Sequence, residues 1–128
     1  MFEKLDIFRM SADMAAHAGR RQALAAQNMA NVDTPGYRAQ RMASFAEIAE
    51  SGDQGTALRA TRAGHLSGGG TELAQARITE DLSDPAPDGN TVSAEGEMLA
   101  SVAAKREHDR ALAIYTSALN VLHTTLKR

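Results

Sequence analysis

Apolar side chains recur at helical spacing through the first thirty residues. At 100° per residue they form two stripes on nearly opposite sides of one helix, spanning residues 3 to about 31. A helix in a two-layer domain usually buries one stripe, so two stripes favour a helix packed on two sides inside an assembly. The central helix of a monomeric bundle is the alternative. One stripe contains Leu5, Phe8, Ala12 and Ala15, and the other contains Ile7, Met10, Met14 and Ala18. Three polar side chains fall in a wedge between the stripes: Asp6, Asp13 and His17.

A second long helix is predicted to begin at Ser93 and to run towards the C-terminus. The Ser93 hydroxyl can cap free amides, and Glu95 and Glu97 in the first turn complement the helix dipole. Large apolar residues then alternate by three and four, which predicts a coiled-coil seam about two heptads long. The seam consists of Leu112, Tyr115, Leu119, Leu122 and Leu126.

The pattern of apolar residues between these two helices is weaker. Met42, Phe45, Ala46 and Ala49 recur at helical spacing and predict a short helix over about residues 40–50.

Residues 51–91 contain seven of the ten glycines together with Pro85 and Pro87. So long an irregular insertion is unusual in a compact domain. We expect it to be flexible in the free subunit and ordered by partners, with short extended pieces near 56–62 and 72–82.

These patterns predict a mainly α fold. Its long N- and C-terminal helices form an antiparallel hairpin with a coiled-coil core, and the Gly/Pro-rich irregular middle segment holds short strands. Residues 1–50 and 93–128 form a single domain, and residues 51–92 form the middle segment.

The segment Asn28–Tyr37 lies where the first helical pattern stops. Pro35 and Gly36 fit the two central positions of a type II turn, because proline fixes φ and glycine accepts a positive φ. Pro35 also disfavours the α conformation at Thr34, so we expect the helix to end at or before Asp33.

Two asparagines three residues apart share one face of the last helical turn. The amides of Asn28 and Asn31 can bond freed backbone carbonyls or a neighbouring chain, and Asn31 can adopt the left-handed conformation after the helix. Tyr37 serves either as a packing anchor or as a local cap on its own helix.

Alanine dominates the apolar composition, with 25 alanines among 55 hydrophobic residues, and the chain has no tryptophan. Alanine buries little area, so at about 25 cal/mol per Å² a chain of 128 residues gains little from its own core. We expect neighbouring chains to complete the core. An ordinary thin helical bundle is the alternative.

Charge and composition narrow the function further. A net charge of −2 with interspersed signs gives no footprint for nucleic acid, and no apolar run is long enough to span a membrane. Acidic residues near the N-terminus argue against a secretory signal peptide. The absence of cysteine excludes disulfides and thiolate metal sites.

No residue pattern predicts catalysis. The four histidines, including His17 and His108, have no spacing that clusters metal ligands, and Glu107-His108-Asp109 is interpreted as a solvated helix face. The run Gly68–Gly70 lacks the Lys-Ser/Thr of a phosphate-binding loop. We expect no catalytic residues, no cofactor, no metal and no small-molecule substrate.

The string Asn-x-Ala-Asn-x-x-Thr-Pro-Gly-Tyr at residues 28–37 resembles the N-terminal signature of bacterial flagellar rod and hook proteins. Its continuation Tyr37-Arg38-Ala39-Gln40 with Phe45, the pair Thr61 and His65, and Gly89-Asn90-Thr91-Val92 resemble the proximal-rod subunits of the FlgB type. The resemblance covers residues 1 to about 50 and 89–128.

This resemblance implies a structural subunit at the proximal, membrane-side end of the flagellar rod, the drive shaft that transmits torque. It implies self-association and contacts with rod subunits of the FlgC, FlgF and FlgG type and with the FliE adaptor. It also implies a periplasmic position near but not across the membrane, reached through the flagellar type III apparatus without a cleaved signal peptide.

The residues expected to pack against other subunits come from both long helices and the turn. They are Leu5, Phe8, Met14, Asn28, Asn31, Thr34, Pro35, Gly36, Tyr37, Leu112, Tyr115, Leu119, Leu122 and Leu126. A non-polymerising helical adaptor or export-associated binding module would use the same seam to bind one partner, and it is the alternative function.

Overall fold

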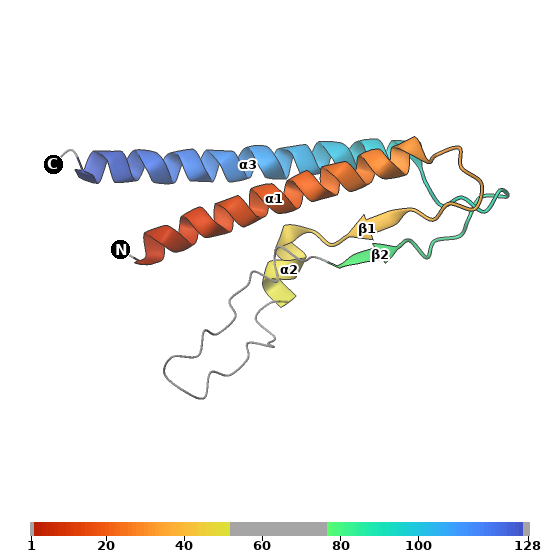
Figure 1. Ribbon diagram of the computed structural model, residues 1–128, viewed down its shortest axis with the longest axis horizontal. Coiled ribbons are helices and arrows are strands. Elements are labelled where there is room, and N and C mark those ends of the chain that lie inside the picture. Colours follow the sequence, from red (N-terminus) through yellow and green to blue (C-terminus); the bar gives the residue numbers. More distant parts are fainter. Residues whose placement is uncertain (1, 52–76, 127–128) are drawn as a thin grey trace, which may run out of the picture.

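Two long antiparallel helices form the body of the molecule. The computed structural model describes residues 2–51 and 77–126. Within them the elements are α1 (Phe2–Ala30), β1 (Gln40–Met42), α2 (Phe45–Ser51), β2 (Ile78–Glu80) and α3 (Ala94–Leu126). Figure 1 shows α1 and α3 side by side, with both chain ends at one end of the hairpin and the connecting turns at the other. The predicted mainly helical fold with an antiparallel hairpin is confirmed.

Small residues form the seam between α1 and α3. Ser11, Ala18 and Ala25 are buried at intervals of seven residues on α1, and Ala104 and Ala111 are buried at the same interval on α3. A period of seven keeps one face of a helix towards its partner, and small side chains let the two backbones approach closely.

The hairpin seam does not include the first and last residues of the predicted leucine seam. Leu112 is 49% exposed and Leu126 is 80% exposed. Leu112 follows the buried Ala111 by one residue, which turns its side chain by about 100° from the hairpin seam. Leu119 and Leu122 are half-buried.

The two helices spread apart towards the chain termini (Figure 1). The rings of Phe8 and Tyr115 still meet edge to face there, with their centroids 5.1 Å apart. Beyond this contact, Ile7 is 42% exposed and Val121 is 51% exposed. The open end of the hairpin thus leaves apolar side chains uncovered.

The second buried face of α1 packs towards β1 and α2. It carries His17, Leu24 and Asn28, all of which are buried. The contacts on both sides of α1 lie within its own chain, whereas its two stripes favour packing inside an assembly. The residues also differ from those of the two stripes. His17 was assigned to a polar wedge and is buried, whereas Ala12 was assigned to an apolar stripe and is exposed.

Residues 40–42 form a strand where a helix was predicted. β1 pairs antiparallel with β2, with Arg41 opposite Thr79. The short helix starts only at Phe45, where Ser44 and Glu47 form a capping box: the Ser44 amide donates to Glu47 Oε2 at 2.7 Å, and the Glu47 amide donates to Ser44 Oγ at 3.3 Å. The Ser44 amide and hydroxyl, which both donate to this carboxylate, hold the pKa of Glu47 below its usual value.

The second strand falls within the extended piece predicted near residues 72–82. The piece predicted near 56–62 lies outside the described residues. Ser93 caps α3 as expected, because its Oγ accepts the Gly96 amide at 3.3 Å. The left-handed conformation expected for Asn31 is absent, since among the described residues only Gly36 and Gly89 have positive φ.

The alanine seam can be tested by enlarging one of its residues. Ala111→Leu would force extra atoms between the helices and should lower the free energy of unfolding by about 1–3 kcal/mol. Ala103→Leu, at an exposed position of the same helix, should change it by less than about 0.5 kcal/mol. Urea unfolding followed by circular dichroism measures both values, and equal effects would argue against a close-packed seam.

Candidate functional site

The amide of Asn28 joins the end of α1 to the start of β1. Asn28 Nδ2 donates to the Gln40 carbonyl at 2.8 Å, and Asn28 Oδ1 accepts the Gln40 amide at 3.0 Å. A side chain thereby bonds this residue as a neighbouring strand would, which explains why residue 40 is extended. The Tyr37 hydroxyl donates to the same Asn28 Oδ1 at 3.3 Å. This contact ties Tyr37 to its own helix, as in the local one of the two roles considered for it.

The Asn31 amide and the Pro-Gly turn close the helix end. Asn31 Nδ2 donates to the Gln27 carbonyl at 2.8 Å, which satisfies one carbonyl left free in the last turn. The Tyr37 amide then donates to the Thr34 carbonyl at 3.2 Å, and Gly36 has a φ of 72°. These are the marks of the predicted type II turn.

Asn90 holds this turn from the other side of the chain. Its Nδ2 donates to the carbonyls of Asn31 at 3.0 Å, Val32 at 2.9 Å and Thr34 at 2.9 Å. Its Oδ1 accepts the Val92 amide at 2.6 Å, and the residue is only 4% exposed. Two amide hydrogens are thus shared among three carbonyls, two of which, those of Asn31 and Thr34, also accept a backbone amide within the turn.

Main-chain bonds on either side of Asn90 complete the contact. Thr91 donates its amide to the Tyr37 carbonyl at 3.1 Å, and its hydroxyl accepts the Ala39 amide at 2.8 Å. The Gly36 amide donates to the Asp88 carbonyl at 3.0 Å. A Cβ on Gly89 would lie 3.3 Å from Gly36 Cα, so the two turns meet glycine to glycine. We call residues 28–40 together with 88–92 the junction.

Ion pairs tie the strands and both helices together beyond the junction. Arg41 lies 3.1 Å from Asp81 and 3.1 Å from Glu97, a carboxylate in the first turn of α3 whose side chain is 2% exposed. Bonds from the Ser83 amide, and then from Arg41, hold the pKa of Asp81 below its usual value.

Arg21 of α1 pairs with Glu107 of α3 at 2.7 Å, across the hairpin. Both side chains are largely covered, at 19% and 23% exposure. The interpretation of residues 107–109 as a solvated face is therefore wrong for Glu107.

His17 is a buried ionisable group where α1, α2 and α3 meet. The residue is 1% exposed, and its ring lies edge-on to that of Phe45 with their centroids 5.8 Å apart. Neither ring nitrogen has a hydrogen-bond partner among the described residues. Burial and the nearby Arg21 lower the pKa of His17 below its ordinary value of 6.5, and the opposing effects of Glu107 and of the nearby Ala43 backbone are smaller.

An apolar groove occupies the open end of the hairpin. Its volume is about 560 Å³, within the range of sites that hold a side-chain cluster or a ligand. Ile7 and Phe8 of α1 form one wall. The other wall comes from α3 and consists of Arg110, Ala113, Ile114, Ser117, Ala118, Val121 and Leu122.

The residues expected to pack against other subunits lie in the junction, at the groove and elsewhere along the hairpin. Asn28, Asn31, Thr34, Gly36 and Tyr37 bond within the junction, and Pro35 is exposed beside them. At the other end, Leu122 and Phe8 line the groove and Tyr115 contacts Phe8. Elsewhere along the hairpin, Met14 and Leu119 are half-buried, and Leu112 and Leu126 face outwards. Leu5 lies in α1, and its side chain is outside the described set.

Several residues that organise the structure were not singled out from the sequence. Asn90 and Thr91 entered only through the family resemblance, and Arg41, Asp81 and Glu107 were not assigned a structural role. The Ser44-x-x-Glu47 pattern is a local signal for a capping box and would have located the start of α2. The partners of Asn90 lie 56 to 59 positions away, so no local pattern marks it.

The described residues form no group of three or more His, Cys, Asp or Glu side chains placed for a metal ion. Over the same residues, neither long helix has the continuous apolar length that crossing a bilayer requires.

Comparison with known proteins gives a consistent result. Proteins named flagellar basal body rod protein FlgB from two strains of Cereibacter sphaeroides are each 32% identical to this chain over 107 residues, covering 84% of this chain and 83% of theirs. A third protein of that name and species is 31% identical over the same shares. No family model matches the chain.

These relatives are by name rod proteins. A helical hairpin with an uncovered apolar end suits that class of protein. Identity and coverage at this level show that the chain belongs to the FlgB family of flagellar basal body rod proteins.

The role of Asn90 can be tested without changing the size of its side chain. Asn90→Asp removes both amide hydrogens and places a buried carboxylate against three backbone carbonyls, so it should lower the free energy of unfolding by about 1–3 kcal/mol. Asn120→Asp makes the same chemical change at an exposed position of α3 and should have little effect. Urea unfolding compares the two, and an unchanged midpoint for Asn90→Asp would contradict the assignment.

His17 should make the fold sensitive to mild acid. The unfolded chain regains the ordinary pKa of 6.5, so below that pH it binds a proton that the folded chain does not. Stability from this group is full above about pH 6.5 and is lost as the pH falls towards the lowered folded pKa.

The measurement is the urea midpoint between about pH 7.5 and pH 5.5, a range in which unperturbed carboxylates stay ionised. His17→Leu should flatten the decline, whereas His123→Gln, at an exposed position, should leave it unchanged. An equally steep decline in His17→Leu would mean that another group is responsible.

Proposed function

We propose that this chain is a structural subunit of the flagellar rod at its proximal, membrane-side end and that its mechanism is assembly. Membership of the FlgB family carries this proposal, and the uncovered apolar surface of the hairpin supports it. Torque passes through such a subunit only if its helices are fixed to those of neighbouring subunits, because dense packing resists deformation.

The distribution of large and small apolar residues supports packing with other chains. Alanines fill the seam inside the hairpin, whereas Met10 is 54% exposed, Val121 is 51% exposed and Ile114 is 38% exposed. Ile114 and Val121 both line the groove, and contiguous exposed apolar groups of this kind mark interaction sites. Of the residues expected to pack between subunits, Leu112 and Leu126 remain exposed on the outside of α3, and Leu122 lines the groove.

The junction has a different part in this proposal. Its asparagines bond within the chain, so we assign them to holding the hairpin and the β1–β2 arm at a fixed angle rather than to contacting another subunit. Arg41 reinforces that angle by bridging the strands to α3. A subunit stiffened in this way transmits force between the surfaces at its two ends.

The neighbours that fit this role are further copies of the chain, rod subunits of the FlgC, FlgF and FlgG type, and the FliE adaptor. The position is the periplasmic part of the basal body, reached through the flagellar type III apparatus. We expect neither catalysis nor a cofactor. The alternative is a non-polymerising helical adaptor, which the groove would also suit as a site for one partner helix.

Site-specific photo-cross-linking in intact cells separates the two functions. A photo-reactive residue replaces Val121 in the groove, and a second variant carries it at Met10 on α1, since both side chains are exposed. If the chain is a rod subunit, both variants should form adducts with rod subunits or FliE in isolated basal bodies.

A matched variant at Ala104, which is fully buried inside the hairpin, should form few adducts with other proteins. Cells in which rod assembly is blocked provide the second control and should lose the basal-body adducts. Adducts confined to one soluble protein, with none in basal bodies, would overturn the rod function and favour the adaptor.

A further inference from the structure

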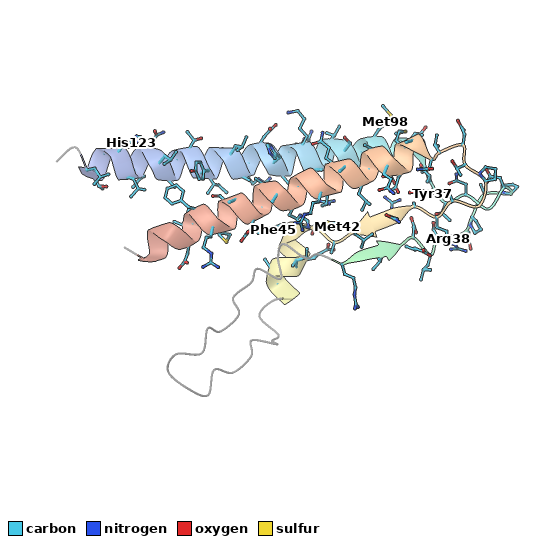
Figure 2. The ribbon with its side chains drawn as sticks, in the orientation of Figure 1. Tyr37, Arg38, Met42, Phe45, Met98 and His123 are labelled. Carbon is cyan, nitrogen blue, oxygen red and sulfur yellow. The ribbon has the colours of Figure 1, made fainter. Side chains whose placement is uncertain are left out.

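The start of α3 carries an apolar ridge that nothing in the described structure covers. Met98 is 63% exposed, Leu99 is 72% exposed and Val102 is 51% exposed. Glu95 is exposed one helical turn before Leu99 on the same side. Figure 2 shows Met98 pointing away from α1, near the junction end of the hairpin. We call these four residues the ridge.

The groove at the opposite end has the complementary character. It is concave and apolar, and Arg110 stands on its wall. Among the described residues, neither the Arg110 guanidinium nor the Glu95 carboxylate forms an ion pair. The molecule therefore has a convex apolar surface with a free acid at one end and a concave apolar surface with a free base at the other.

The ridge cannot reach the groove of its own chain. Both lie on α3, roughly 25 Å apart along a continuous helix with a rise of 1.5 Å per residue. Matching shape and opposite charge can meet only between two molecules. We propose that the ridge of one copy docks into the groove of the next, with Glu95 pairing with Arg110. This inference rests on the proposed function, because it names a second copy of the chain as the partner at the groove.

The contact is heterologous, since it joins two different surfaces and leaves one of each free. Such contacts continue from copy to copy unless a rotation closes them into a ring. At 100° per residue, the ridge and the groove face directions about a quarter turn apart around α3. Successive copies are therefore rotated relative to one another as well as displaced.

A cysteine-free chain allows a direct test with engineered cysteines. One purified preparation carries Met98→Cys on the ridge, and a second carries Val121→Cys in the groove. Mixed at high protein concentration under mild oxidation, they should form a disulfide-linked heterodimer, while each alone should stay largely monomeric. Efficient homodimers of the Val121→Cys protein would show groove facing groove and would overturn the proposal, as would the absence of any heterodimer.

Charge reversal then tests the pairing of Glu95 with Arg110. Glu95→Arg on the ridge partner, or Arg110→Glu on the groove partner, should lower the heterodimer yield about five-fold, and combining the two should restore it. Arg38→Glu, on the far side of the molecule from Met98 in Figure 2, is the matched control and should leave the yield unchanged. Circular dichroism of each variant verifies that the helices are intact.

The failure of this inference can be told apart from failure of the proposed function. Basal-body adducts from Val121 without the heterodimer would leave the rod function standing and overturn the ridge–groove contact. Conversely, the heterodimer without basal-body adducts would support the contact and overturn the rod function. Lack of rescue in the double charge reversal would remove the Glu95–Arg110 pair from the proposal.

Discussion

The side-chain amide of Asn90 satisfies three carbonyl groups at once where α1 gives way to the Pro-Gly turn. Together with the bonds of Thr91 to Tyr37 and Ala39, this contact fixes the start of α3 relative to the end of α1. Because α3 begins four residues after Asn90, the contact helps to set the position from which the second helix returns. That starting point brings Arg21 opposite Glu107, with which it pairs, and places Ala104 in the seam. Buried polar networks of this kind specify one arrangement when every member is bonded.

The small residues of the seam have an effect on the outside of the molecule. Alanine in the seam lets α1 and α3 lie close together, but it removes little apolar surface from water. The larger side chains, such as Ile7, Val102 and Val121, are left on outer faces or in the groove. The small residues that make the hairpin thin therefore also leave apolar surfaces exposed on its outside.

Local patterns predicted what local forces determine. The two long helices, the Ser93 cap and the type II turn at Pro35 depend on neighbours in sequence, and all three appear as expected. The strand at residues 40–42 was not predicted. Gln40 is held extended by a bond from Asn28, and helical periodicity gives no sign of that bond. Leucines were preferred to alanines as the seam although Ala104, Ala111 and Ala118 keep the same period of seven. Burial of His17 depends on Phe45 of another helix. Periodicity identifies a helix, but it does not say which face meets which partner.

Closure of the Pro-Gly turn by residues 88–92 has a consequence for the order in which the chain can fold. The end of α1 and the turn are translated first, yet the bonds that Asn90 donates to them form only when a segment nearly sixty positions later is available. A chain emerging N-terminus first from any narrow conduit would hold α1 without its mate until α3 followed. Contacts this distant in sequence slow folding, because the loop must close before they form. The native hairpin therefore forms late, after most of the polypeptide has left the conduit.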